Sequence, residues 1–290
     1  MVPGRWTAPL VALVGVSLFV LGACADPQAI RDREAEPIVY EADAFVLDDP
    51  VREPVLCLGT VASSLPPQCE GIALAGWKWD AVGGEDAASG STWGTFHLTG
   101  TYDGTTFTVR DAGPSVPQPS DADPRVPPCP EPQGGWSSPD LALAGEHDMI
   151  NASHVAEEES DFSGFWIDYV GQPVGEFETE PGSIIVTAAF TGELERHTRG
   201  IREVWGGPLC VIEQQRTYAD LRRIQRELGD GGAATELGLQ TTWSGVDIQE
   251  NVFELGVVVA DARAEQAVEE RYGEGVVVLR PALVPVDEES

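Results

Sequence analysis

Five cysteines are the residues of this chain whose chemistry depends most clearly on spacing: Cys24, Cys57, Cys69, Cys129 and Cys210. Zinc and dithiol redox sites commonly use two cysteines separated by two residues, and no such pair occurs here. With Cys24 set apart, the other four form an even set that can close two disulfides in three ways. The short loop between Cys57 and Cys69 favours that pair, which leaves Cys129 to join Cys210.

The first 23 residues have the layout of an export signal. Arg5 supplies a positive charge, and the apolar run from Leu10 to Leu21 is too short to span a bilayer. The run ends in Leu21-Gly22-Ala23-Cys24, which resembles the lipobox of bacterial lipoproteins. We therefore expect Cys24 to carry a diacylglyceryl thioether that holds the protein at the extracytoplasmic side of the cell membrane. The alternative is an incidental cysteine after an ordinary secretory signal.

The charge balance narrows the choice of partners. The chain has 48 acidic and 17 basic residues, and its formal net charge is -31. Such a surface repels phosphates and anionic lipid headgroups, so we expect no nucleic-acid partner and no membrane contact beyond the lipid. Acidity of this kind is typical of a soluble exported domain, and the alternative is a role in capturing cations or basic ligands.

One acidic stretch contains residue types that could bind a metal ion. It comprises Glu146-His147-Asp148, then His154, Glu157 to Glu159 and Asp161. Two histidines seven residues apart share a helix face only if the helix begins before the first of them, and no known ligand spacing is present. We expect a solvated helix here and no metal site.

Motifs for catalysis are missing from the sequence. There is no Gly-x-Ser-x-Gly turn, the four histidines have no recognisable Ser or Cys partner motif, and no glycine-rich phosphate loop lies between a strand and a helix. We therefore assign no catalytic residue and no cofactor. Pairs of carboxylates are inevitable among so many acids, so a glycoside hydrolase stays open.

Three tryptophans could form a ligand surface. Trp77 and Trp79 alternate along one predicted strand, and Trp93 lies on the next. Exposed, they would offer a stacking platform for envelope sugars, whereas buried they would fill a small barrel. We favour the buried role, since aromatic stripes are usually packing.

The overall pattern predicts an α+β protein. Large apolar residues occupy even positions at Ile72 and Leu74 and odd positions after Gly76, and this change indicates a bulge. The pair Asp103-Gly104 predicts a hairpin. A small OB-type barrel fits this N-terminal pattern, and a curled antiparallel sheet fits nearly as well. The expected divisions are a signal at 1–23, a flexible tether at 24–53, a β-rich domain at 54–112, a Pro/Gly-rich linker with a short helix at 113–180, and an α+β domain at 181–285.

The C-terminal domain contains a faint internal repeat. The pattern of strand, helix and strand occurs twice. The first helix ends at Arg202 to Gly206, and the helix of the later unit ends at Glu269 to Gly273. Two βαβ-like units predict one ferredoxin-like sheet with helices on one face. An additional helix at Thr217 to Leu228 departs from the simplest version of that fold.

Several motifs together resemble uncharacterised predicted lipoproteins of actinobacteria. The residues that carry the resemblance are Cys57-Leu58-Gly59, Leu65 to Cys69, Gly76-Trp77-x-Trp79, Thr92-Trp93-Gly94, Gly100 to Gly104, Cys129-Pro130-x-Pro132-x-Gly134-Gly135-Trp136, Asp161-Phe162-x-Gly164-x-Trp166, Phe190-Thr191-Gly192 and Trp205 to Cys210. The resemblance covers most of the mature chain and implies a lipid-anchored, disulfide-containing envelope protein. It implies no particular activity.

These observations favour a non-catalytic binding or interaction module whose partner is an envelope protein or polysaccharide. An envelope hydrolase with unidentified carboxylates is the first alternative. A peptidase regulator is the second, and it rests on fold analogy alone.

The lipid attachment can be tested directly. In a bacterial host, Cys24→Ala should move the protein from the membrane fraction to the soluble fraction, because the acyl chains supply the membrane affinity. Immunoblots of the two fractions measure the change, and globomycin treatment of the unaltered protein should block signal cleavage. Unchanged partitioning of Cys24→Ala, or normal signal cleavage in the presence of globomycin, would contradict lipidation.

Overall fold

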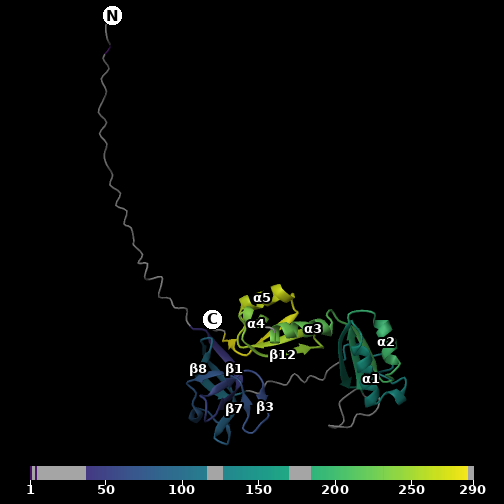
Figure 1. The fold of residues 1–290 in the computed structure, drawn as a ribbon, viewed down its shortest axis with the longest axis horizontal. Coiled ribbons are helices and arrows are strands. Elements are labelled where there is room, and N and C mark those ends of the chain that lie inside the picture. The colour runs from purple at the N-terminus through teal and green to yellow at the C-terminus, as the bar shows by residue number, and fades with distance from the viewer. Residues whose placement is uncertain (2–3, 5–36, 116–126, 170–183, 231, 287–290) are drawn as a thin grey trace. The chain divides into compact units, whose positions relative to one another are not determined.

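The computed structural model describes residues 1, 4, 37–115, 127–169, 184–230 and 232–286 (Figure 1). The rest of the predicted signal, Cys24 and the first part of the predicted tether lie outside these residues. The described residues from Ile38 onward belong to one compact unit. No helix among the described residues is long and apolar enough to cross a membrane.

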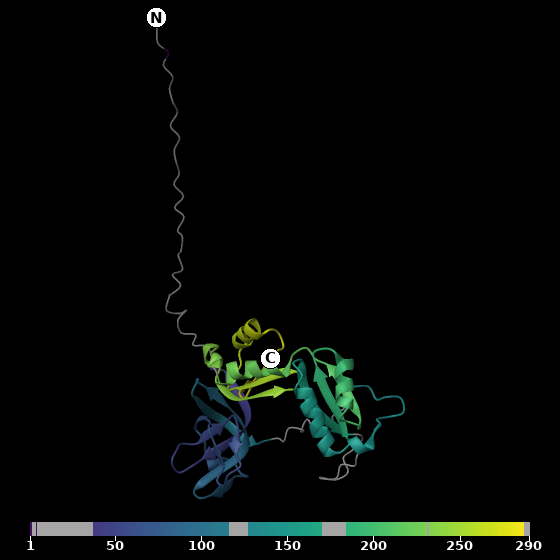
Figure 2. The ribbon, with the colours of Figure 1, turned by 45° about the vertical axis from the view of Figure 1, so that its right-hand side comes forward.

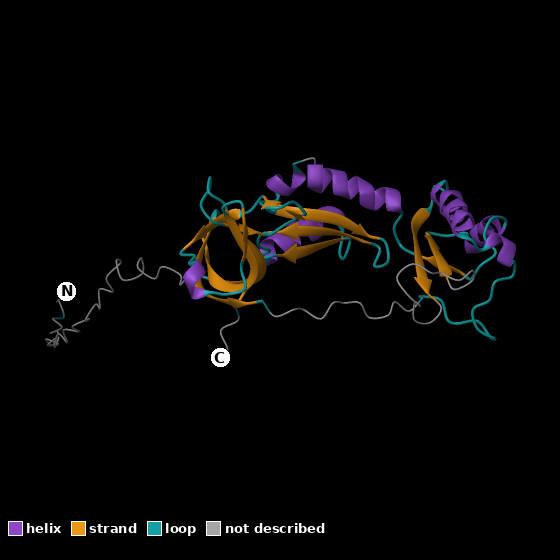
Figure 3. Ribbon diagram, turned by 90° about the horizontal axis from the view of Figure 1, so that it is seen from below, coloured by secondary structure: helices purple, strands orange, loops and turns teal. Residues whose placement is uncertain are grey.

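Five strands of the N-terminal part close into a ring, which Figure 3 shows nearly end-on. β1 pairs with both β2 and β7, the order around the ring is β1-β2-β5-β8-β7-β1, and only β5 and β8 are parallel. The bounds of these strands are β1 Val39–Asp48, β2 Val55–Cys57, β5 Ile72–Ala75, β7 Ser91–Tyr102 and β8 Thr106–Pro114. The mixed α+β class and the β-rich N-terminal part are therefore confirmed.

Alternation places the apolar side chains of the long strands inside this barrel. Ala42, Ala44 and Val46 of β1 and Phe96 and Leu98 of β7 are all buried in one core. The register of β7 and β8 shifts at Gly100, where a side-chain carbon would lie 2.3 Å from the carbonyl oxygen of Thr108. A residue without a side chain therefore lets the two strands cross closely at the bulge.

Shorter elements complete the barrel region. The smaller elements are the hairpin β3 Val61–Ala62 and β4 Gln68–Cys69, the helical turn η1 Trp79–Ala81, the strand β6 Asp86–Ala88 on β7, and the strand β15 Val284–Pro285 on β1. β5 ends at Ala75, and Gly76 has a positive φ of 78°, so the expected bulge is a turn that ends the strand. The hairpin at Asp103-Gly104 lies where it was predicted.

The predicted tether at 24–53 is too long, because β1 occupies residues that were assigned to it. The outward positions of β1 include Glu41 and Asp43, and these acids gave the segment the composition of a linker. Their inward neighbours are small apolar residues that fill the barrel. A strand with one solvated face can thus be hidden by its charged side.

Residues 141–169 and 184–213 form a first αββαβ unit around its own sheet (Figure 2). The sheet has the order β11-β10-β9, in which β9 and β10 are antiparallel and β10 and β11 are parallel. Both main helices pack on the same face, since Ala152 of α1 and Ile201 of α2 share a core with Val186, Ala188 and Phe190. The elements are η2 Leu141–Leu143, α1 Glu146–Glu157, β9 Phe162–Tyr169, β10 Ile184–Phe190, α2 Leu194–Arg202 and β11 Leu209–Glu213.

Residues 218–281 form a second αββαβ unit with the same topology. Its sheet has the order β12-β13-β14, and Leu221 of α3 and Val268 of α5 pack on Phe253, Leu255 and Val257 of the central strand. The elements are α3 Tyr218–Gln225, η3 Arg226–Asp230, α4 Ala233–Glu236, β12 Thr241–Asp247, β13 Val252–Val257, α5 Ala262–Tyr272 and β14 Val277–Pro281.

The two units repeat at a constant interval. Their central strands begin at residues 184 and 252, the following helices at 194 and 262, and the last strands at 209 and 277, which is 68 residues each time. The repeat predicted from the sequence is therefore present in the fold. The additional helix expected at Thr217 to Leu228 is explained, because α3 is the first helix of the second repeat.

The arrangement of the strands differs from the single ferredoxin-like sheet expected for 181–285. The strands lie in two separate sheets, and the strands joined by each crossover helix pair directly with one another. In a ferredoxin-like sheet another strand lies between them. The segment 113–180, expected to be a linker with a short helix, contributes α1 and the strand β9.

Each αββαβ unit uses the same edge for packing. We call this the carboxyl edge, where the second and third strands end and the first strand begins. In the first unit, Gln214 beyond β11 donates to the carbonyl oxygens of Ile248 and Gln249 in the β12–β13 turn at 2.9 and 3.1 Å. Arg216 and Asn251 exchange two further hydrogen bonds of 2.9 Å. The carboxyl edge of the second unit meets the barrel.

Both disulfides have the predicted pairing. Cys57 and Cys69 have Cα atoms 5.9 Å apart, and those of Cys129 and Cys210 are 5.7 Å apart. The first bond closes a loop of 12 residues beside the barrel, and the second a loop of 81 residues that fixes the segment before α1 to β11.

Loop length predicts which disulfide contributes more to the free energy of unfolding. Replacing Cys129 and Cys210 by Ser should lower the free energy of unfolding by about 4.5 kcal/mol, and replacing Cys57 and Cys69 by about 3 kcal/mol, since longer loops gain more entropy when released. Urea unfolding of both double variants measures the difference. An equal or reversed order would show that native contacts, not loop entropy, set the two values.

Candidate binding site

The carboxyl edge of the second unit is built into the barrel. Val258, next to the end of β13, and Leu283, after β14, are 4% and 0% exposed and belong to the barrel core. β15 follows Leu283 and pairs with Tyr40 and Glu41 of β1. The barrel and the second unit therefore share one apolar core.

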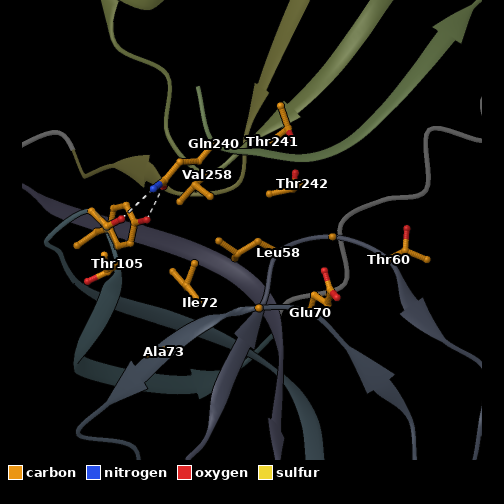
Figure 4. A pocket seen from close by; sticks show the side chains of 14 residues that line it. Leu58, Thr60, Glu70, Ile72, Ala73, Thr105, Gln240, Thr241, Thr242 and Val258 are labelled. Atoms are coloured by element: carbon orange, nitrogen blue, oxygen red, sulfur yellow. Dashed lines mark hydrogen bonds between the residues drawn. The ribbon is translucent and has the colours of Figure 1, made fainter. Parts of the chain in front are cut away.

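A polar contact closes one side of this junction (Figure 4). The hydroxyl of Tyr102 donates to Oε1 of Gln240 at 2.6 Å, and Nε2 of Gln240 donates to the carbonyl oxygen of Gly104 at 2.9 Å. Burial raises the pKa of Tyr102, so its hydroxyl stays protonated as the donor. Gln240 thus fixes the β7–β8 hairpin to the start of β12.

Asp103 shapes the hairpin from within. Its Oδ1 accepts the backbone N–H groups of Thr106 and Thr105 at 2.8 and 2.9 Å. These bonds hold the pKa of the Asp103 carboxyl below its ordinary value, the bond from Thr106 contributing most. The turn is therefore in place before any ligand arrives, with Thr105 on its exposed side.

A pocket of about 680 Å³ lies between the barrel and the second unit. It is lined by Leu58, Gly59, Thr60, Glu70, Gly71, Ile72, Ala73, Tyr102, Gly104, Thr105, Gln240, Thr241, Thr242 and Val258. The lining contains hydroxyls, an amide and one carboxylate, and no Lys, Arg or His. Such a site can exchange neutral hydrogen bonds with a ligand and offers no cation for a phosphate.

Gly59 permits the close approach of the two walls. A side-chain carbon at this position would lie 2.6 Å from the carbonyl oxygen of Thr242. Larger residues would push β12 away from β2 and widen the pocket.

A second polar cluster lies in the first unit, at its carboxyl edge. His197 is 3% exposed, its ring stacks on Phe190 with centroids 3.7 Å apart, and its Nε2 lies 2.8 Å from Oδ2 of Asp161. Arg196 donates both terminal nitrogens to Glu159 at 2.8 and 2.9 Å and holds the pKa of that carboxyl below its ordinary value. Glu159, Asp161 and His197 could together offer ligand atoms to a metal ion.

The guanidinium of Arg196 already supplies positive charge to this cluster. Arg196 also lies 3.9 Å from Oδ1 of Asp161, so an incoming cation would have to displace it. His147 and His154, the histidines considered from the sequence, are exposed on α1 and are not part of the group. The sequence reasoning missed His197, although a histidine on the apolar face of a predicted helix needs a polar partner.

The three tryptophans do not form one surface. Trp77 and Trp79 meet edge to face with centroids 5.2 Å apart, both contact Phe96, and Nε1 of Trp79 donates to Asp48 at 2.9 Å. Trp93 packs in another cluster with Leu47 and the Cys57–Cys69 disulfide. The prediction that Trp77 and Trp79 alternate along one strand is wrong, because β5 ends at Ala75 and Trp79 begins the helical turn η1. All three tryptophans are half-buried.

Comparisons with known proteins add no relative. No protein-family model matches the chain, and no curated protein is similar to it.

The pair of Arg196 and Glu159 predicts that the stability of the fold depends on pH. A lowered pKa means that Glu159 binds its proton less readily in the folded state, so the pair stabilises the fold above the ordinary pKa of 4.5. That stabilisation is lost as the pH falls through the folded-state pKa. We expect Arg196→Gln to be less stable than the unaltered protein at neutral pH, and the difference to vanish in acid, as followed by urea unfolding across the pH range.

NMR titration provides the direct check. The pKa of Glu159 should rise towards its ordinary value in Arg196→Gln. Arg223→Gln, which removes the exposed pair between Arg223 of α3 and Glu227 of η3, is the matched control and should leave the titration of Glu159 unchanged. A Glu159 pKa that is the same in all three proteins would contradict the role given to Arg196.

Proposed function

We propose that this protein is a lipid-anchored, extracytoplasmic binding module without catalytic activity. The apolar N-terminal run, the cysteine that ends it and the even set of paired cysteines support this assignment. The resemblance to predicted actinobacterial lipoproteins belongs to the same proposal. Its partner in the envelope is a polysaccharide or a protein, and no nucleic acid is expected.

We also propose that the barrel is of the OB type. The strand order β1-β2-β5-β8-β7-β1 and the parallel β5–β8 pair support this, as a five-stranded Greek-key barrel requires. In such barrels the second and third strands and the loop between the last two form the ligand face. Here those elements are β2, β5 and the β7–β8 hairpin.

The observation that carries the proposed function is the junction pocket on that face. Leu58 and Ile72 supply an apolar floor, and Thr60, Thr105 and Gln240 supply neutral hydrogen-bonding groups. Neutral polar groups beside an apolar surface suit an uncharged, hydroxyl-rich ligand such as an oligosaccharide. The pocket is therefore proposed as the binding site.

The alternatives have less support from this geometry. Glycoside hydrolysis uses two carboxyl groups on either side of the bond, and Glu70 is the one carboxylate that lines the pocket. A peptidase regulator was suggested by analogy with ferredoxin-like folds, and the strand pairing here differs from that topology.

Binding of neutral oligosaccharides tests the proposal. Titration of the mature protein with chitotetraose and maltotetraose should shift the amide NMR signals of the residues that line the pocket. Thr60→Val and Thr105→Val each remove one hydroxyl at nearly constant volume, and each should weaken binding about threefold to tenfold. Thr108→Val, an exposed threonine of β8 outside the pocket, is the control.

Two results would overturn the proposal. Neither sugar would shift the amide NMR signals of the pocket residues, or the affinity for the sugars would be the same in all three variants. In either case the pocket would not be a saccharide site.

A further inference from the structure

The outermost strand of the first unit has an edge that no other described strand covers. β9 pairs with β10 alone, and its sequence from Phe162 to Tyr169 contains no Lys, Arg or Pro. Uncovered edges in proteins are normally protected by charges, prolines or bulges that prevent pairing with another chain. In β9 the register shift lies between Phe162 and Gly164, and the one acid, Asp168, is buried and accepts a hydrogen bond from Thr187. The part from Phe165 to Ile167 has none of these protections.

Only the first part of this edge is occupied. A side-chain carbon at Gly164 would lie 3.1 Å from Cβ of Ile248, and the ring of Phe162 meets that of Tyr218 with centroids 5.9 Å apart. Both contacts come from the second unit. The remaining part, from Phe165 to Tyr169, includes a tyrosine that is 39% exposed.

A groove of about 630 Å³ runs along β9, from the occupied part, where Tyr218 and Ile248 also line it, to the uncovered part at Phe165 and Ile167. Phe165 and Ile167 form one wall, and Met149 and Ile150 of α1 form the other. Ile150 is 42% exposed, and Glu157 is the one charged residue of the lining. An apolar groove next to a row of backbone hydrogen-bonding groups is the arrangement used for β-strand addition.

We propose that an extended peptide segment of a partner protein binds here as an added strand beside β9. Alternate side chains of the peptide, aliphatic in character, would enter the groove against Phe165 and Ile167, while its backbone pairs with the strand edge. A basic residue beside the aliphatic ones would face Glu157. The net charge of -31 favours such a partner and opposes a second copy of this chain.

The free backbone edge favours a peptide over a lipid chain as the occupant of the groove. An acyl chain could fill the groove but would leave the N–H and C=O groups of β9 without partners, and no Lys or Arg of the lining would hold a phosphate. The inference does not depend on the junction pocket, which lies between other elements.

The test uses the mature protein and three labelled peptides. Lys-Val-Thr-Val-Thr-Val-Lys should bind in fluorescence anisotropy, and the same peptide with alternate backbone nitrogens methylated should bind about tenfold more weakly, because strand donors are lost. A peptide with Glu in place of both Lys should also be weaker at low salt. Hydrogen exchange should show protection at residues 165–169 with the first peptide.

Two variants locate the site. Ser153→Trp fills the groove from α1, and Ile167→Lys places a charge in it, so both should abolish binding of the Lys peptide. Leu141→Lys, an exposed apolar residue outside the groove, is the control that should bind normally. Circular dichroism establishes that each variant is folded, and the two groove variants are independent of each other.

The inference is overturned if none of the peptides binds, or if binding is insensitive to N-methylation or to both groove variants. A dimer of the unaltered protein in light scattering that Ile167→Lys converts to a monomer would instead assign the groove to a second copy.

Discussion

The need to bury the carboxyl edge of the second αββαβ unit governs how the barrel and that unit are joined. Val258 and Leu283 lie at the ends of its strands, and both are apolar. Separating them from the barrel would expose apolar surface on both sides, at a cost of about 25 cal/mol for each Å². The β1–β15 pairing and the Tyr102–Gln240 bond occur where this burial holds the two parts together. The junction pocket exists because the same contact leaves a hollow beside it.

The repeat shows two ways of closing the same edge. In the second unit, residues 226–240 lie between its first helix and first strand, and Leu228 and Leu239 from this segment enter the apolar core. In the first unit the corresponding connection runs only from 158 to 161. There Glu159 forms an ion pair with Arg196, and Oδ2 of Asp161 lies 2.8 Å from Nε2 of His197. The connection in the second unit is held by apolar burial, which pH hardly affects, and the connection in the first unit is held in part by the Glu159–Arg196 charge pair.

Structural features that depend on neighbouring residues were predicted correctly from the sequence. The Asp103-Gly104 hairpin, the helix beginning after Thr217 and the repeated helix endings all follow from neighbouring residues. Strand β1 was missed because Glu41 and Asp43 conceal its inward apolar face. The division into two sheets was missed because a repeat interval carries no information on which strands pair. The Gln240 contact joins residues 138 positions apart, and a neutral amide in a loop gives no sequence signal of its partner.

Strand β15 has a consequence for how the chain reaches its final state. A polypeptide is made from its N-terminus, so all five barrel strands are complete long before Leu283 is synthesised. Until then the core of the barrel lacks Leu283. Forming this contact is slow, because Leu283 is far from the barrel strands in the sequence. The nascent chain would therefore need protection from aggregation at this surface. Proteolytic trimming near Leu283 would loosen a barrel formed by the opposite end of the chain.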